Sequence, residues 1–321
     1  MNGADQFVEH LALRVREAEP ISPLLKRFVF EAADGGELPP AGPGAHLRLT
    51  LQGGGRRWKN AYSIVSAPAD RSHLAIIVRR VAQSRGGSAF LHEAVETGHI
   101  VAAHEPGNLF PISRIAQKHL MVSGGIGVTP FLAYMTALKQ DGAPFELHHF
   151  CRDEEVSVFE SILSCFDASN IHIHPASAAF DLSAALTSQP LGTHLYTCGP
   201  EGLMTMALAA ARDHGWPKSK LHSESFGGAH AGGVPFIAIL QRSGLKVSVR
   251  DDQTLLEAIE EAGLEPACLC RGGACGECLT SVIEGEPDHR DHFLDAGEHA
   301  SNRSIMICVS RAKTNSLILD L

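Results

Sequence analysis

Residues 268–278, which read CLCRGGACGEC, constrain the fold of this chain more than any other stretch. They hold four of its eight cysteines, interleaved with small residues. The spacing is Cys270-x4-Cys275-x2-Cys278, and Cys308 follows after residues 279–307. Because the chain begins without a basic start or an apolar run, we expect it in the cytoplasm, where disulfides are rare. The thiols therefore indicate a metal or redox centre.

This spacing is the ligand pattern of plant-type ferredoxins, and it predicts a 2Fe–2S cluster held by Cys270, Cys275, Cys278 and Cys308. The small residues between them let the backbone wrap closely and turn N–H groups towards the sulfurs. A structural zinc site is the alternative, but it usually combines two C-x2-C knuckles, and only one is present. Cys268 is expected to be a small buried neighbour and not a fifth ligand.

Length and charge limit the number of domains and the kinds of partner that the chain can have. The 321 residues are enough for two or three domains. No stretch approaches the roughly 20 apolar residues that span a bilayer, so no membrane association is expected. A net charge of −9 argues against nucleic acid as a partner, because phosphate binding needs a basic surface.

Changes of hydrophobic pattern divide the chain. Residues 1–112 alternate apolar and polar positions between Gly/Pro turns, which predicts an antiparallel β-barrel. Residues 113–226 alternate strands with helices, which predicts a doubly wound α/β domain. The Gly-rich stretch 227–234 is interpreted as a linker. Residues 235–321 hold strands, a helix with a capping box and the cysteines, which predicts an α+β ferredoxin (β-grasp) domain.

Four short motifs in the first two domains fit binding of a flavin and a dinucleotide. NAYS (60–63) lies in a predicted strand, where a tyrosine can lie on an isoalloxazine ring. RGGS (85–88) precedes a helical pattern, whose first amides can hold an anion. GGIGVTP (124–130) follows a strand and lets a pyrophosphate approach a helix that Thr129 is predicted to cap. CGPEG (198–202) is a second turn from strand to helix. Each motif alone is weak, because such turns are common in purely structural roles.

Together with the cysteines, these motifs make the chain resemble the phthalate dioxygenase reductase family, the FMN- and 2Fe–2S-containing reductases that supply Rieske oxygenases. The resemblance covers essentially the whole chain, in the order flavin barrel, nicotinamide domain and ferredoxin. It rests on eight stretches: AYSI, SRGGS, GGIGVTP, CGPEGLM, HSESFG, CRGGACGEC, GEPDHRD and ICVSRAK…LILDL. NAYS also resembles the reductases of carnitine and other quaternary-amine oxygenases.

The resemblance implies roles for individual residues. Those expected to contact the flavin or hold its phosphate are Tyr62, Ser63, Arg79, Gly86, Gly87 and Ser88. Those expected to line the nicotinamide cleft are Gly125, Gly127, Thr129, Cys198 and Gly199. Phe226 is expected to shield the flavin ring, and with Cys198 and Ser63 it makes up the implied catalytic group. FMN is expected over FAD, because nothing extra in the sequence serves an adenine half.

One position departs from the family pattern. Asn60 stands where the family usually has an arginine, two positions before the tyrosine, so another cation must supply the missing charge for the flavin phosphate. The candidates are Arg56, Arg57, Lys59, Arg79 and Arg85, and the last two lie closest to the expected phosphate.

The stretch CRDEE (151–155), after the second strand of the α/β domain, bears on the choice of nicotinamide. Its acids repel a 2′-phosphate, and Asp153 can accept a hydrogen bond from a ribose hydroxyl. Arg152 opposes this by pairing with a phosphate, but its acidic neighbours partly neutralise it. NADH is therefore expected, and a plain solvated loop is the alternative.

The number of electrons that each centre exchanges fixes the order of NADH, flavin and cluster along the electron path. NADH gives two electrons as a hydride, a 2Fe–2S cluster accepts one, and a flavin handles both, so it stands between them. We expect an NADH-dependent oxidoreductase whose partner is a terminal oxygenase protein of the Rieske type. Its oxygenase system acts either on carnitine and other quaternary amines or on aromatic substrates that are demethylated or hydroxylated. The alternatives are a reductase for another acceptor such as a haem oxygenase, a non-enzymatic redox sensor, and a zinc-stabilised interaction module.

The 18 histidines are not assigned to the reaction. His172 and His174 alternate in a predicted strand, as a metal-binding pair does. No third ligand with suitable spacing along the chain supports that interpretation.

Overall fold

The structure is a computed structural model that describes residues 11–81, 86–226 and 232–321. The chain forms two compact units, Met1–Glu224 and Ser225–Leu321. Most of the predicted linker 227–234 lies outside the described residues. Within the described part of the chain, no helix is both long and apolar enough to cross a membrane.

The first unit begins with an antiparallel sheet that has the predicted barrel character. Its strands stand in the order β4-β3-β6-β1-β2-β5, with β7 paired to β3, and a single bridge between Ile64 and Ile76 links the two ends of that order. The elements are β1 (Leu11–Pro20), β2 (Leu25–Ala32), β3 (Ala45–Gly53), β4 (Arg56–Ser63), β5 (Leu74–Arg79), α1 (Gly87–Ala94), β6 (Ile100–Ala103) and β7 (Gly107–Asn108).

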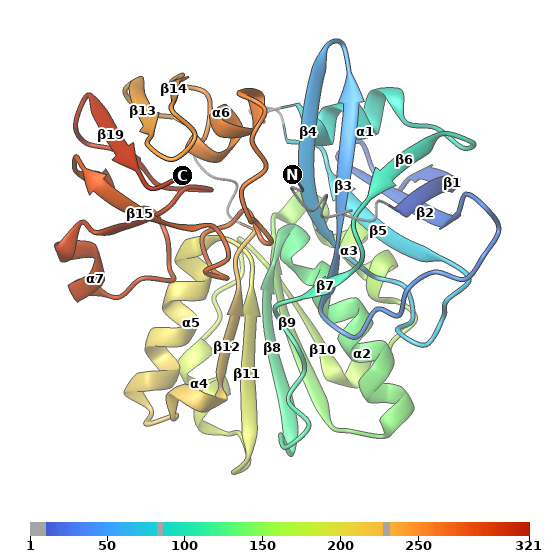
Figure 1. The fold of residues 1–321 in the computed structure, drawn as a ribbon. Coiled ribbons are helices and arrows are strands. Elements are labelled where there is room, and N and C mark those ends of the chain that lie inside the picture. Colours follow the sequence, from blue (N-terminus) through green and yellow to red (C-terminus); the bar gives the residue numbers. More distant parts are fainter. Residues whose placement is uncertain (1–10, 82–85, 227–231) are drawn as a thin grey trace. The chain divides into compact units, whose positions relative to one another are not determined.

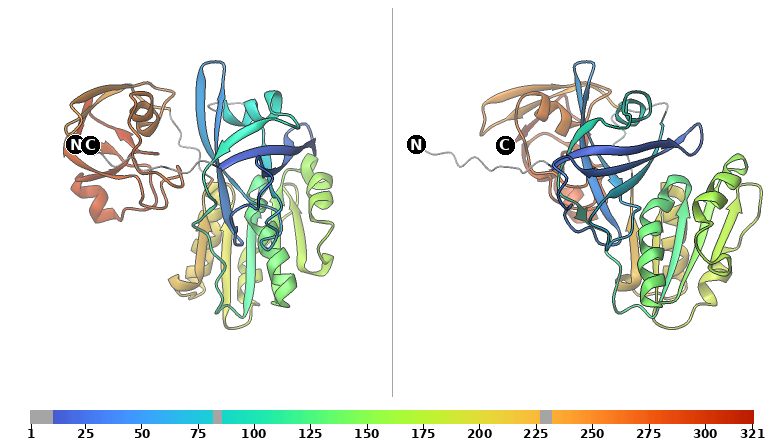
Figure 2. Two further views of the ribbon diagram at one scale, coloured as in Figure 1. Left: turned by 45° about the vertical axis from the view of Figure 1, so that its right-hand side comes forward. Right: turned by 90° about the vertical axis from the view of Figure 1, so that its right-hand side faces the viewer.

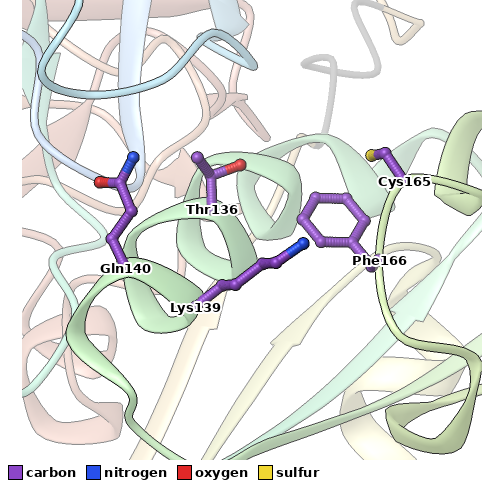
Figure 3. Close-up of a pocket in the computed structure, with 5 residues that line it drawn as sticks. All are labelled: Thr136, Lys139, Gln140, Cys165 and Phe166. Atoms are coloured by element: carbon purple, nitrogen blue, oxygen red, sulfur yellow. The ribbon is translucent and has the colours of Figure 1, made fainter.

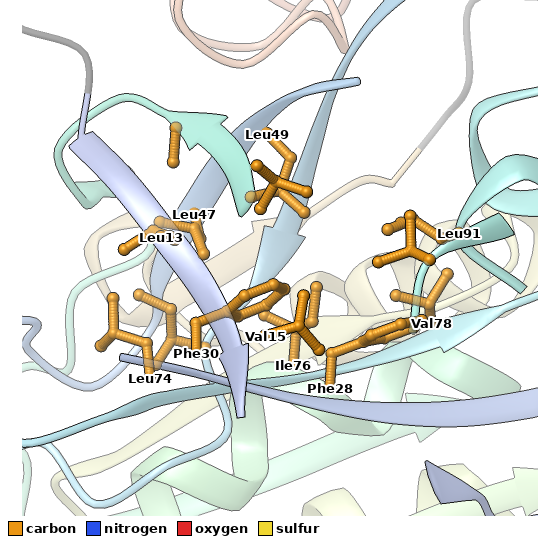
Figure 4. Close-up of a cluster of buried hydrophobic side chains, with 14 of the residues drawn as sticks. Leu13, Val15, Phe28, Phe30, Leu47, Leu49, Leu74, Ile76, Val78 and Leu91 are labelled. Carbon is orange, nitrogen blue, oxygen red and sulfur yellow. The ribbon is translucent and has the colours of Figure 1, made fainter. Parts of the chain in front are cut away.

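Alternation along these strands builds the barrel core. Every second residue of β2 and β5 points inward, such as Phe28 and Phe30 beside Ile76 and Val78, and Leu91 of α1 joins the same core (Figure 4). Burial of these apolar side chains is the main force that closes the sheet.

The second half of this unit is a parallel sheet in the order β10-β9-β8-β11-β12. Helices α2 and α3 share a core with one face and α4 and α5 with the other, which is the predicted doubly wound layout (Figures 1 and 2). The elements are β8 (Lys118–Gly124), η1 (Gly125–Val128), α2 (Thr129–Asp141), β9 (Phe145–Cys151), η2 (Asp153–Glu155), α3 (Val156–Leu163), η3 (Ala168–Asn170), β10 (Ile171–Pro175), α4 (Leu182–Thr187), β11 (Thr193–Cys198), α5 (Glu201–Asp213), η4 (Lys218–Lys220) and β12 (Leu221–Glu224).

The barrel and the parallel sheet share apolar packing. Leu25 and Ile77 of the barrel belong to the same buried cluster as Phe110, Phe131 and Tyr134. This shared core explains why the two halves form one compact unit, although the sequence pattern changes near residue 112.

The second unit has the predicted ferredoxin-like fold. Its mixed sheet runs β14-β13-β19-β15-β17, with β13 and β19 parallel, and helix α6 begins at a Thr254–Glu257 capping box. The elements are β13 (Phe236–Leu240), β14 (Leu245–Val249), α6 (Leu255–Glu261), β15 (Leu279–Glu284), β16 (Pro287–Asp288), α7 (Ala296–Ser301), β17 (Ser304–Met306), β18 (Arg311–Ala312) and β19 (Ser316–Leu319).

Candidate functional site

The predicted nicotinamide motifs meet at one edge of the parallel sheet. β8 and β11 are neighbours, and Ser123 stands opposite Cys198 in their register. From β8 the chain continues to β9 on one side and later returns to β11 on the other, so the strand order reverses between β8 and β11. Such a reversal opens a crevice at the carboxyl ends of the strands, where dinucleotides bind.

Glycines let the two turns at this crevice touch through their backbones. A Cβ on Gly127 would stand 2.3 Å from the carbonyl oxygen of Cys198, and one on Gly199 would stand 2.7 Å from the backbone nitrogen of Gly124. Within the part of the chain that the structure describes, Gly125, with φ +52°, has only Arg79 Nη1 near its Cβ position, 4.0 Å away. The first contacts serve packing between the turns, whereas Gly125 leaves room for the predicted pyrophosphate.

Thr129 does not cap α2 as the sequence predicted. Residues 125–128 form the 3-10 turn η1, which runs directly into α2, so Thr129 is already helical. Its buried hydroxyl donates to the carbonyl oxygen of Ile126 at 2.9 Å. Thr129 therefore holds the turn together, and its contact with a dinucleotide stays a prediction.

Glu224, which the sequence analysis did not single out, lies beside Cys198. It ends β12 and stands opposite Cys198 in the β11–β12 register. Complete burial raises the pKa of the Cys198 thiol well above its usual value, and the Glu224 carboxylate raises it further. The thiol is therefore protonated at neutral pH and is no thiolate nucleophile. Glu224 lies within the HSESFG motif, but the sequence gives no sign that it differs from other acidic residues. Its position beside Cys198 follows from the pairing of β11 with β12.

The acidic loop after β9 lies at the same edge of the sheet. Arg152 and Asp153 are both exposed. Asp153 Oδ1 accepts hydrogen bonds from the Ser177 backbone N–H at 3.1 Å and from its hydroxyl at 2.9 Å. Dinucleotide domains commonly place their ribose-binding acid beyond this strand. The loop position fits that role, and the ribose contact itself stays a prediction.

The NAYS motif lies at the end of β4, in the barrel. Asn60 Nδ2 donates to the Tyr62 hydroxyl at 3.0 Å, and Tyr62 packs against the barrel core. Ser63 is buried, and among the described residues its Oγ has no hydrogen-bond partner. A buried hydroxyl without a partner is costly, and the polar edge of a flavin supplies one. The residues present therefore fit the predicted cofactor.

Helix α1 begins at the predicted glycines. Gly86, at φ +106°, precedes the helix, and no side chain caps this helix start; binding of an anion by the amides of the first turn stays a prediction. A Cβ on Gly87 would stand 2.6 Å from Asn60 Nδ2. The short Asn60 side chain thus lies against the helix start, where the family carries an arginine.

Two further residues expected near the flavin phosphate have protein partners. Ser88 Oγ accepts from the Val81 N–H at 3.3 Å. Arg79 Nη1 pairs with Glu155 Oε1 at 2.7 Å, and the two side chains are only 19% and 13% exposed. This pair joins the end of β5 to η2, so the role of Arg79 at the phosphate stays a prediction. Arg85, the other candidate cation, lies outside the described residues.

The C-terminal unit gathers the predicted cluster ligands. The Cys270 thiol interacts with those of Cys275 and Cys308, and the Cys278 thiol also interacts with that of Cys308. Cys268 lies among them, because its thiol contacts those of Cys278 and Cys308. Four thiolates in one group are the donor set of a 2Fe–2S cluster.

The loop that carries three of these cysteines depends on glycine. Gly273 and Gly276 have φ values of +72° and +82°, and a Cβ on Gly276 would meet the Phe293 ring at 2.4 Å. The Gly272 N–H donates to Cys270 Sγ at 3.3 Å. Hydrogen bonds of this kind tune the potential of a cluster.

Two features remain to be placed, the predicted residue Phe226 and a hollow on the surface. Phe226 is 40% exposed and belongs to the second unit, so its place over the flavin stays a prediction. A surface hollow of about 500 Å³ is lined by Thr136, Lys139, Gln140, Cys165 and Phe166, with the Lys139 side chain pointing towards the Phe166 ring (Figure 3). None of the predicted site residues lines this hollow.

Two family models match parts of the chain. Residues 238–313 match a 2Fe–2S iron–sulfur cluster binding domain. Residues 105–221 match the N-terminal domain of proteins like DmmA, a dimethylamine monooxygenase subunit.

Whole proteins are similar over nearly their full lengths. The carnitine monooxygenase reductase subunit of Acinetobacter pittii is 37% identical over 94% of this chain and 100% of its own. The haem-dependent oxidative N-demethylase beta subunit of Ectopseudomonas mendocina is 41% identical over 97% and 99%. The solved structure of phthalate dioxygenase reductase covers 97% of this chain and 98% of its own, at 32% identity and a TM-score of 0.85.

Proposed function

The chain belongs to the family of flavin- and 2Fe–2S-containing oxygenase reductases that includes carnitine monooxygenase reductase and phthalate dioxygenase reductase, and on this premise we propose that it serves a Rieske-type oxygenase. It is an oxidoreductase that uses NADH, FMN and a 2Fe–2S cluster. The observation that carries its role in electron transfer is the group of four cysteine thiols, in a chain whose first unit holds the barrel and the parallel sheet. The type of oxygenase is proposed from the similarity to carnitine monooxygenase reductase and phthalate dioxygenase reductase.

The residues of the chain bind and orient the flavin and the nicotinamide, and none of them acts as an acid or a base in the reaction. A bound flavin would supply the exchange between the two-electron hydride of NADH and the single electrons that a 2Fe–2S cluster takes. Tyr62 and Ser63 hold the ring, and the amides at the start of α1 hold its phosphate beside Asn60. The protonated Cys198 closes the buried side of the nicotinamide cleft next to Glu224.

The substrate of the proposed oxygenase is an N-methylated amine. Carnitine carries such a group, and another relative is named for oxidative N-demethylation. A haem oxygenase is the second candidate partner. It is supported by the 41% identity to the beta subunit of a haem-dependent demethylase and by the match to the DmmA-like domain.

The path through the cluster is tested with two cysteine variants. Cys275→Ser removes a ligand, so NADH-dependent reduction of cytochrome c, a one-electron acceptor, is expected to fall to background. Reduction of ferricyanide through the flavin is expected to persist. Cys268→Ala is the matched control and is expected to keep both activities and the visible cluster absorption. Unchanged cytochrome c reduction in Cys275→Ser would remove the cluster from the path.

The partner is tested by reconstitution. The reductase and NADH are mixed under anaerobic conditions with a carnitine-type Rieske oxygenase or with a haem-dependent demethylase. Electron paramagnetic resonance follows the reduced Rieske centre, and the carbon monoxide difference spectrum follows the reduced haem. Faster reduction of the Rieske protein supports the proposal, whereas exclusive reduction of the haem protein replaces it with the second candidate.

A further inference from the structure

Three histidines and a glutamate gather on one face of the parallel sheet, on two neighbouring strands. Glu146 and His148 lie on β9, and His172 and His174 lie on the edge strand β10. The register sets His172 opposite His148, and alternate residues of a strand share a face. The third ligand that the sequence did not supply thus comes from the neighbouring strand. Glu146 and His172 are each the second residue of their strand, at the amino ends, whereas the nicotinamide crevice lies at the carboxyl ends.

The distances within the group suit a metal ion. Glu146 Oε1 lies 2.9 Å from His148 Nε2 and 3.6 Å from His172 Nε2. One donor atom from each of these residues lies within 4.8 Å of the others. Bonds of about 2.0–2.1 Å to a tetrahedral zinc ion place two ligand atoms roughly 3.3 Å apart. The two distances from Glu146 Oε1, 2.9 and 3.6 Å, are slightly shorter and slightly longer than this value.

Surrounding residues hold these donors in place. Lys118 Nζ and Gln189 Nε2 donate to Glu146 Oε2 at 2.7 and 3.1 Å, which leaves Oε1 towards the imidazoles. His148 is 4% exposed, and its Nδ1 lies 3.0 Å from His174 Nε2. A metal-bound histidine characteristically has such a partner on its second nitrogen, which fixes its tautomer.

The group is open to solvent at His172. This side chain is 42% exposed at the edge of the sheet, so an ion has a route of entry, and the fourth coordination position is left to water.

We propose that Glu146, His148 and His172 bind a divalent ion of the zinc class, with His174 as a positioning residue. Two imidazoles and one carboxylate form a donor set that zinc accepts, and a hard cation such as Mg²⁺ prefers oxygen ligands only. The ion cross-links the edge strand β10 to β9 and stabilises the nicotinamide half of the first unit. The site is independent of the proposed oxygenase partner.

A second His–Asp–His group, in the C-terminal unit, is a weaker candidate. Asp291 Oδ2 lies 3.3 Å from His299 Nε2, and Oδ1 lies 3.7 Å from His289 Nδ1. The same Oδ2 already accepts the Leu294 backbone N–H at 2.9 Å, and Oδ1 accepts the Ser310 hydroxyl at 3.3 Å. The carboxylate is thus engaged in holding its own loop.

The test measures Zn²⁺ binding by isothermal titration calorimetry at pH 7.5, with untagged protein that carries its flavin and cluster. The wild type is expected to bind one equivalent of Zn²⁺ at this site, and His172→Asn is expected to lack this binding. The loss of affinity should exceed the roughly 100-fold that loss of an outer partner can cause, and His174→Asn should weaken binding about 10- to 100-fold. His214→Asn, which removes an exposed histidine of the same unit, should bind as the wild type does.

Thermal unfolding with and without Zn²⁺ provides a second readout. Zinc should raise the Tm of the wild type and of His214→Asn, and leave that of His172→Asn unchanged. Retained visible spectra and ferricyanide reduction show that each variant is folded. Equal Zn²⁺ stoichiometry and affinity in the wild type and His172→Asn would overturn the proposal, and the group would then be a hydrogen-bonded cluster only.

Discussion

At the scale of single residues, glycines of similar appearance in the sequence have different physical roles. Gly127 and Gly199 are needed because a neighbouring backbone occupies the space of their Cβ atoms. Gly125 is needed for its left-handed φ of +52° and borders open space. A motif of small residues therefore combines a packing requirement with a binding requirement.

Gly127→Ala tests the packing role. Its new methyl group would meet the Cys198 carbonyl, so we expect a loss of roughly 1–3 kcal/mol in the free energy of unfolding. The displaced turn should also raise the KM for NADH.

Gly202→Ala is the control for this change. Among the described residues, nothing lies within 4 Å of its Cβ position, so urea unfolding should show no loss of stability. Equal urea midpoints for the two variants would contradict the packing role of Gly127.

At the scale of elements, the start of a helix was the least predictable feature. Thr129 followed by proline is a common helix start, but η1 extends the helical path upstream and makes Thr129 an internal residue. The capping box at Thr254 and Glu257 was confirmed, because it depends only on residues three apart in the chain.

Strand pairing also produces a histidine pair with a pH-dependent effect. His194 Nδ1 and His222 Nε2, on β11 and β12, lie 2.9 Å apart. Burial lowers the pKa of both below 6.5, and neighbouring His119 lowers them further, as Lys220 does for His194.

The sign of the pH effect follows from these lowered pKa values. Below pH 6.5 the unfolded chain takes up these protons before the folded one does. Stability is therefore fully present above pH 6.5 and declines as the pH falls below it.

Urea unfolding of His222→Asn at pH 7.5 and 5.5 tests this effect. Asparagine keeps a hydrogen-bond donor and does not titrate, so the variant should lose less stability on acidification than the wild type. His214→Asn should behave as the wild type does. A wild-type pH slope in His222→Asn would show that the pair does not contribute.

At the scale of the whole molecule, each buried core belongs to one unit. The core of the C-terminal unit runs from Phe236 to Leu319 and includes Cys278 and Cys308. In the first unit, one core lies within the barrel, one lies within the parallel-sheet half, and a third is shared by the two halves. Two units with separate cores are expected to fold separately.

Expression of residues 1–226 and 232–321 as two chains tests this expectation. The first should bind flavin and reduce ferricyanide with NADH, without reducing cytochrome c. The second should carry the cluster, visible in its absorption and, after reduction with dithionite, by electron paramagnetic resonance. An insoluble second fragment, or one without iron, would show that the units depend on each other.

The sequence by itself determined the features whose information is local. The spacing of Cys270, Cys275 and Cys278 predicted the cluster because one loop carries these three ligands. Alternation and strand–turn–helix motifs predicted the barrel and the doubly wound sheet, because each element records its own periodicity.

Only the tertiary structure decided which distant residues meet. It placed Asn60 against the start of α1, paired Arg79 with Glu155, and set Glu224 beside Cys198. It also brought Glu146 and His148 next to His172. These contacts depend on strand order and register, and a shift of one residue turns every side chain of a strand to the other face. The spacing of residues along a single strand does not reveal which strand pairs with it or in which register.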